Sequence, residues 1–186
     1  MARSVAVIVG SLRKESYSRK LALALADLAK PALDLKIVEI RDLQLYNEDT
    51  EKKPTEAWTA FRNQLRGMDA VLFVTPEYNR SIPGCLKNAV DVGSRPYGSS
   101  VWSGKPAAIV SNSPGAIGGF GANHHLRQCL VFLDMPVMQQ PEAYISGSNK
   151  LVGDDGKIID DSKREFLTKF MQAFAQLVEH IIAAQE

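Results

Sequence analysis

The chain has 186 residues, which is enough for one well-packed domain and short for two. It is 45% hydrophobic and 23% charged, the balance of an ordinary soluble globular protein. The formal net charge of +1 argues against a nucleic-acid-binding surface and against a surface for acidic substrates. We therefore predict a single domain over residues 1–186.

Two further features indicate a cytoplasmic protein. Cys85 and Cys129 lie far apart in apolar, helix-like stretches, which is typical of reduced core cysteines in a reducing compartment. The apolar run at 5–9 is too short for the core of a signal peptide or for a membrane span.

The first half of the chain alternates strand and helix patterns. Unbroken apolar runs at 5–9 and at 70–74 predict strands buried on both faces of a parallel sheet. Between them, residues 35–40 mix apolar with charged side chains, which indicates a strand at the edge of the sheet. Helices are predicted on either side of that edge strand, with apolar faces formed by Leu21, Leu25 and Leu28 and by Trp58, Phe61 and Leu65.

The second half continues the alternation. Pro83 suits the first turn of a helix that runs to about Val92. The next predicted elements are a strand at 107–110, a helix at about 122–133 and a short fifth strand, either at 137–138 or at 144–145.

The last helix is predicted from about Ser162, after a Gly-, Asp- and Lys-rich stretch at 146–161 that we expect to be a surface loop. Its core-facing stripe is predicted to be Phe166, Phe170, Phe174, Leu177 and Ile181. Strands that alternate with helices and connect by right-handed crossovers predict an α/β flavodoxin-like fold, a doubly wound five-stranded parallel sheet of order 2-1-3-4-5. Such sheets bind ligands beyond the carboxyl ends of their strands.

The loop from Gly10 to Ser18, after the first strand, has the composition of a phosphate site. Its serines offer hydroxyl groups, Arg13 offers a charged guanidinium, and the following helix points free N–H groups into the loop. The glycine patterns of a P-loop and of a dinucleotide-binding loop are both absent. The loop therefore predicts a phosphate monoester site; the alternative is an ordinary serine-capped start of a helix.

Two more loops follow strands at the same edge of the sheet. The loop 75–84 holds Tyr78 and Asn79 between two prolines, and it offers backbone N–H groups and an aromatic wall to a flat heteroaromatic ring. The loop 111–121 contains four glycines in seven residues, which allow a close approach of backbone to ligand. Together the three loops predict a site for a phosphorylated, planar cofactor.

Three segments carry a resemblance to a known family. They are Gly10-Ser-Leu-Arg-Lys-x-Ser, Thr75-Pro-Glu-Tyr-Asn-x-Ser-x-Pro-Gly-x-Leu-Lys-Asn-Ala89, and Ser103-Gly-Lys-Pro106. Up to about Pro141 the chain resembles the NADPH-dependent FMN reductases, and within them the bacterial quinone and chromate reductases. The resemblance implies a flavodoxin-like fold, FMN as cofactor, NAD(P)H as electron donor, and a homodimer or homotetramer with flavin sites near subunit boundaries.

The resemblance also implies which residues bind the cofactor. Those around the phosphate are Ser11, Arg13, Ser16, Tyr17 and Ser18, and those around the flavin ring are Pro76, Glu77, Tyr78, Asn79, Ser113 and Gly115. Arg80 is a candidate contact for the phosphates of NADPH, the alternative being a solvent-facing arginine. The family often has Asn at position 18. Some members have Arg and Tyr where this chain has Gly121 and His124, and there they join subunits with an acid matching Glu142.

The expected activity is an NAD(P)H oxidoreductase that reduces quinones and related acceptors, with chromate, azo and nitro compounds as candidates. In the expected ping-pong scheme a hydride passes to flavin N5, and the donor leaves before the acceptor binds. This scheme needs neither a catalytic side chain nor a metal, and the three histidines form no metal-binding pattern. The alternatives are a flavodoxin-type single-electron carrier, against which the near-neutral charge argues, and a phosphate-binding regulatory domain.

Overall fold

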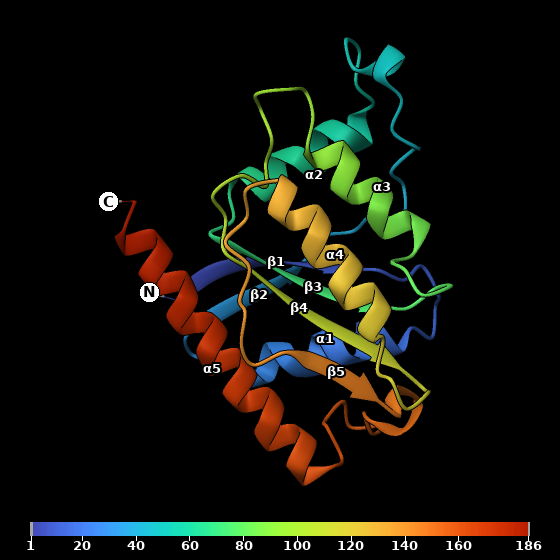
Figure 1. The fold of residues 1–186 in the computed structure, drawn as a ribbon, viewed down its shortest axis with the longest axis vertical. Helices are drawn as coiled ribbons and strands as arrows, with labels where there is room; N and C mark the ends of the chain where they lie inside the picture. The colour runs from blue at the N-terminus through green and yellow to red at the C-terminus, as the bar shows by residue number, and fades with distance from the viewer. Residues whose placement is uncertain (1, 186) are drawn as a thin grey trace.

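The centre of the molecule is a parallel β-sheet of five strands in the order β2-β1-β3-β4-β5 (Figure 1). The structure is a computed structural model that describes residues 2–185. Its strands are β1 (Arg3–Val9), β2 (Leu33–Ile37), β3 (Ala70–Pro76), β4 (Ala107–Ser113) and β5 (Ala143–Ser146). The predicted flavodoxin-like α/β fold and its strand order are therefore confirmed, with β2 at one edge.

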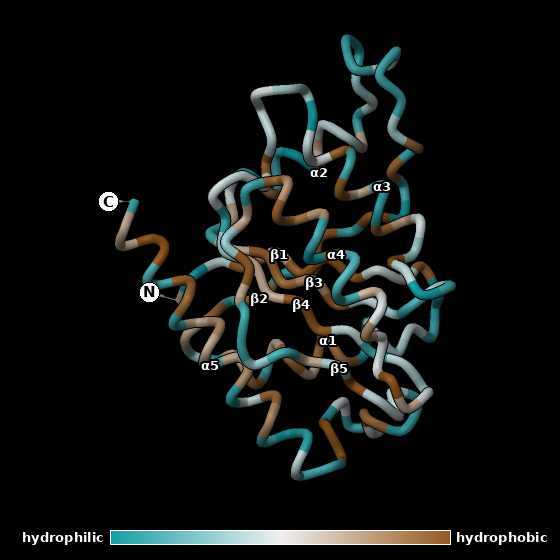
Figure 2. Tube along the Cα trace, in the orientation of Figure 1, coloured by the Kyte–Doolittle hydropathy of each residue, from teal (hydrophilic) through white to brown (hydrophobic). Residues whose placement is uncertain are grey.

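Helices cover both faces of the sheet. They are α1 (Tyr17–Leu28), α2 (Glu56–Arg66), α3 (Gly84–Gly93), α4 (Phe120–Phe132) and α5 (Asp161–Ala183), with short 3-10 helices η1 (Glu48–Thr50) and η2 (Ser148–Lys150). One buried cluster joins the sheet to α1 and α5, and a second joins it to α2, α3 and α4. In Figure 2 the strands accordingly form a hydrophobic centre between helices of mixed polarity. Within residues 2–185, no helix combines the length and apolarity of a membrane span.

The unbroken apolarity of β1 follows from its two buried faces. Val5, Val7 and Val9 pack toward α1 and α5, whereas Ala6 and Ile8 pack toward the other helical layer. Successive side chains of a strand point to opposite faces, so the middle of a strand between two helical layers is apolar on both faces.

Two helix details differ from the sequence predictions. Pro83 is the N-cap of α3, one position before its first turn. The buried face of α5 is formed by Leu167, Phe170, Met171, Phe174 and Val178. Of the other predicted residues, Phe166 and Leu177 are partly buried beside this face, and Ile181 is half-buried outside the cluster. The prediction selected the aromatic residues of the helix. Its stripe is therefore rotated slightly around the helix axis from the face that packs on the sheet.

The stretch 146–161 is more ordered than the predicted surface loop. Leu151 and Ile158 are buried in the core, and an antiparallel bridge joins Val152 to Ile158. The fifth strand lies at the second of its two predicted positions, while Val137 forms only an isolated bridge to β4. The apolar residues within the polar stretch therefore anchor it against α5 and the sheet.

Candidate functional site

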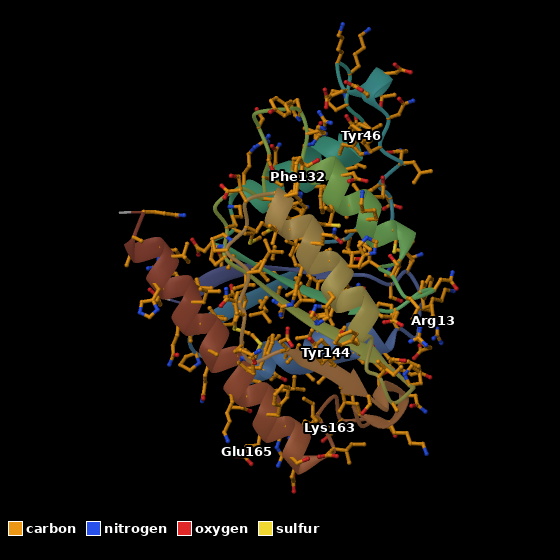
Figure 3. The ribbon with its side chains drawn as sticks, viewed as in Figure 1. Arg13, Tyr46, Phe132, Tyr144, Lys163 and Glu165 are labelled. Atoms are coloured by element: carbon orange, nitrogen blue, oxygen red, sulfur yellow. The ribbon has the colours of Figure 1, made fainter. Side chains whose placement is uncertain are left out.

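A cavity of about 140 Å³ lies where β1, β3 and β4 end. Arg13 marks this edge of the sheet on the right of Figure 3. All the predicted cofactor-binding residues line the cavity except Asn79 and Gly115, and Asn112, Pro114 and Ser148 join them. The complete lining is Ser11, Arg13, Ser16, Tyr17, Ser18, Pro76, Glu77, Tyr78, Asn112, Ser113, Pro114 and Ser148.

One end of the cavity is built by the start of α1. Ser16 is buried and caps the helix, with its Oγ accepting a hydrogen bond from the N–H of Arg19 at 3.2 Å. Its hydroxyl proton remains free to donate. The exposed Arg13 guanidinium stacks over Tyr17, 5.3 Å from the ring centroid. A cation, a hydroxyl donor and the N–H groups of a helix N-terminus together suit a doubly charged phosphate.

Ser18 is held by a partner that the sequence analysis missed. Its hydroxyl is buried against Asn112, whose Nδ2 donates to Ser18 Oγ at 2.9 Å and to the carbonyl of Thr75 at 3.2 Å. Asn112 thereby ties the first turn of α1 to the end of β3 beside the cavity. Its signal in the sequence is a polar Ser-Asn pair that ends the otherwise apolar strand β4.

The second loop forms a tight hairpin at the side of the cavity. The backbones of Tyr78 and Ser81 exchange two hydrogen bonds of 2.9 Å, and Asn79 and Arg80 between them have left-handed φ angles of 51° and 64°. Two left-handed central residues are typical of a two-residue hairpin turn. In this hairpin Tyr78 is exposed and lines the cavity, whereas Asn79 is not among the lining residues.

The Glu77 carboxylate points toward helix α4. Its Oε2 accepts from the N–H of Ala122 at 3.1 Å, and its Oε1 lies 3.2 Å from Nη1 of Arg80. Ser81 Oγ lies 2.6 Å from Nδ1 of His125, which is also on α4. The hairpin is therefore fastened to α4 at both of its ends.

The glycines of the third loop serve its packing on the sheet. Gly118 has a left-handed φ of 63°, and a Cβ on it would lie 2.5 Å from the carbonyl carbon of Tyr144 on β5. Gly115 donates its N–H to Ser113 Oγ at 3.1 Å and lies outside the cavity lining. Ser113 itself lines the cavity as predicted.

Three other reactive side chains lie near the site, and each has surroundings of its own. Cys85 lines a neighbouring cavity of about 420 Å³, and burial raises the pKa of its thiol, which keeps it protonated at neutral pH. His124 Nε2 lies 2.8 Å from the hydroxyl of Tyr144, so the adjacent histidines have separate partners. Among residues 2–185, no three His, Cys, Asp or Glu side chains are placed to hold a metal ion.

The cavity fits a phosphorylated planar cofactor. Its α1 end supplies the charge and donors for a phosphate, and its hairpin side supplies a proline and an exposed tyrosine for a ring. The buried hydroxyl of Ser148, which has no hydrogen-bond partner, also lines it. Ser148 lies in the Gly-, Asp- and Lys-rich stretch 146–161, and no pattern in that stretch predicts that its side chain is buried at a cavity.

Comparisons with known proteins agree with this description. The sequence model of the NADPH-dependent FMN reductase family matches residues 3–150. A quinone reductase of Pseudomonas putida is 67% identical over 177 residues, which are 95% of each chain. A 2-hydroxy-1,4-benzoquinone reductase of a Burkholderia species is 46% identical over 178 residues, 96% of this chain and 97% of its own. The structure of FerB, a flavoenzyme NAD(P)H:(acceptor) oxidoreductase of Paracoccus denitrificans, superimposes with a TM-score of 0.92 at 41% identity, covering 96% and 98% of the two chains.

Proposed function

The chain belongs to the NADPH-dependent FMN reductase family, and from this premise we propose that it is an FMN-dependent NAD(P)H oxidoreductase that reduces quinones. The observation that carries the proposal is the convergence of a phosphate-type loop and a hairpin with an exposed tyrosine in one cavity at the end of the sheet. A relative with 67% identity that is named a quinone reductase supports the choice of acceptor.

The chain's own residues bind and orient the cofactor in this proposal. The FMN phosphate is bound by Ser11, Arg13, Ser16 and the first N–H groups of α1. Ser18 also lies at the phosphate, and Asn112 holds its hydroxyl in place. The residues Pro76, Glu77, Tyr78, Asn79, Ser113 and Gly115 form the surroundings of the isoalloxazine ring. When bound, FMN supplies the hydride chemistry at its N5 atom, so no side chain needs to act as acid, base or nucleophile.

Arg80 is proposed to contact a phosphate of the donor NAD(P)H. Its side chain is 74% exposed and stands on the flavin-ring hairpin, with Glu77 holding it from one side. A guanidinium placed beside the ring reaches the phosphates of a dinucleotide whose nicotinamide stacks on the flavin. Chromate, azo and nitro compounds are proposed as further acceptors of the same exposed reduced flavin.

We further propose that residues 1–186 form one domain and that the protein works in the cytoplasm as a homodimer or homotetramer. The surface that supports self-association lies between α3 and α4, around a cavity of about 770 Å³. Tyr97 and Phe132 line this cavity although they are 90% and 88% exposed, and Val131 beside them is 72% exposed. Exposed aromatic side chains around a cleft are typical of protein interfaces.

The proposed function is tested by visible absorption of the protein reconstituted with FMN and kept anaerobic. We expect NADPH to bleach the flavin band faster than it bleaches free FMN, and benzoquinone to restore it. A bound flavin that NADPH does not bleach would favour a single-electron carrier. A protein that binds no flavin would contradict both functions and favour a phosphate-binding regulatory domain.

A further inference from the structure

Ser148 has an unusual place for a serine. Its side chain is only 5% exposed, its Oγ has no hydrogen-bond partner, and it lines the cavity that holds the start of α1. The only other buried side-chain polar atom without a partner in residues 2–185 is Nη2 of Arg62, on helix α2. Buried polar groups in native proteins nearly always have a partner, so an orphan that faces a cavity indicates a missing ligand.

We propose that the Ser148 hydroxyl donates a hydrogen bond to the phosphate of bound FMN. This inference rests on the proposed function, because it assigns a further residue to the same cofactor site. A lone buried hydroxyl destabilises the cofactor-free protein, since the group has lost water and gained nothing in return. An acceptor oxygen of the cofactor gives it a partner and so contributes to cofactor affinity.

The fold brings Ser148 to the phosphate end of the cavity. Helix η2 follows β5 directly and packs against α1 and β4, and Ser148 lines the same cavity as Ser16 and Ser18 at the start of α1. Leu151, the residue after η2, is buried in the core and fixes its position. Lys163 Nζ donates to the carbonyl of Ser146 at 3.0 Å and holds the end of β5.

The phosphate is the partner that these surroundings favour. The same cavity is lined by Arg13 and Ser16, and the N-terminus of α1 adds a partial positive charge. A hydroxyl among such groups donates best to an anion, because hydrogen bonds to charged acceptors are stronger than neutral ones. An ordered water and a hydroxyl of the ribityl chain are the competing partners that the experiment separates.

The test compares FMN with riboflavin, which lacks the phosphate, in wild type and Ser148→Ala. We expect Ser148→Ala to raise the Kd for FMN about tenfold and to change the Kd for riboflavin less than about twofold. Fluorescence quenching on the cofactor-free protein measures both constants. Urea unfolding of the cofactor-free protein should show equal or higher stability in Ser148→Ala, since the variant removes an unsatisfied hydroxyl.

Ser111→Ala is the matched control. Ser111 is another buried serine, but its hydroxyl donates to the carbonyl of Ala143 at 3.3 Å. This variant should lower the stability of the cofactor-free protein and leave the ratio of the two Kd values unchanged. Ser148→Cys keeps a side chain of similar size with a weak donor, and it should behave as Ser148→Ala does.

Three outcomes would overturn the inference. An unchanged Kd for FMN in Ser148→Ala would mean that water alone satisfies the hydroxyl. Equal losses for FMN and riboflavin would place the contact away from the phosphate. A clear loss of stability in the cofactor-free variant would show that Ser148 has a structural partner. If wild type itself binds no FMN, the proposed function fails first, and that result is distinct from these three.

Discussion

Arg13 is the charged side chain of the phosphate-type loop, and its environment leaves the guanidinium available. It is exposed, and its stacking on Tyr17 fixes its direction without using its N–H donors. We expect Arg13→Ala to weaken FMN binding by about one to two orders of magnitude, since a hydrogen bond to a charged group is worth roughly 1.5–3 kcal/mol. Fluorescence titration of the cofactor-free protein measures this loss.

Lys14→Ala is the control for Arg13→Ala. Lys14 is also an exposed cation, but it does not line the cofactor cavity. The control removes the same charge at nearly the same place and should change FMN affinity little. Equal effects of the two variants would mean that only the general charge of the loop matters, and Arg13 would not be a phosphate ligand.

Arg80 combines a surface charge with an unusual backbone. Its φ of 64° is a left-handed conformation that glycine adopts at lower cost. Loss of the guanidinium should raise the KM for NADPH about fivefold in both Arg80→Ala and Arg80→Gly, because an exposed charge pair is worth about 1 kcal/mol. Steady-state kinetics with NADPH and NADH measure the change. If neither KM moves in either variant, Arg80 does not bind the donor.

At the scale of elements, helix α4 fixes the hairpin that flanks the cavity. A Cβ on Gly121 would lie 2.8 Å from the carbonyl oxygen of Arg80 and 3.0 Å from Oε2 of Glu77. Only a glycine lets α4 approach the hairpin this closely, and the hydrogen bond from Ala122 to Glu77 depends on that approach. A larger residue at position 121 requires a displaced hairpin or helix.

We therefore expect Gly121→Ala to lower both Tm and FMN affinity, although alanine is about 1 kcal/mol better than glycine inside a helix. Gly84→Ala is the control, because Gly84 is also in the first turn of a helix and has no atom near its missing Cβ. That variant should keep or raise Tm in a thermal melt. A Gly121→Ala protein with raised Tm and unchanged FMN affinity would show that the hairpin or α4 moves enough to accommodate the added methyl group at little cost.

Across the molecule as a whole, the two most exposed aromatic residues, Tyr97 and Phe132, line the large cavity of the α3 and α4 side, whereas the cofactor cavity lies where β1, β3 and β4 end. Figure 3 shows Tyr46 and Phe132 in the upper part of the molecule and Arg13 at its right edge. Tyr46 and Phe132 both line the large cavity of that side. Because the two cavities share no lining residue, the proposed binding of a second copy at the large cavity would leave the cofactor cavity uncovered by these residues.

Phe132→Ser should shift the protein toward the monomer, because it removes an 88% exposed aromatic ring from the lining of the large cavity on this surface. Sedimentation velocity over a range of concentrations measures the shift. The control is Leu23→Ser on α1, a 56% exposed residue in the opposite helical layer, which should leave the oligomeric state unchanged. Unaltered association of the Phe132 variant would place the interface elsewhere.

The arrangement of the sheet and the general position of the cofactor site could be predicted from the amino-acid sequence. Strands buried on both faces need unbroken apolar runs, and these runs at 5–9, 70–74 and 107–110 located three neighbouring strands. The edge strand and the strand order followed from polarity and crossover rules. The loops that end such strands share one edge, so their polar residues were predicted to lie together.

Which side chains face the cavity and which face a neighbouring element depends on how the elements pack together. The polar end of β4 marks Asn112 as unusual, but its bond to Ser18 and the place of Ser148 in the cavity depend on contacts between segments far apart in the chain, which no local pattern encodes. The Glu77 carboxylate points to α4 because a helix N-terminus with free N–H groups lies beside it. Local periodicity and turn residues determine where helices and strands begin and end. The direction of a side chain depends instead on the groups that other helices, strands and loops place beside it.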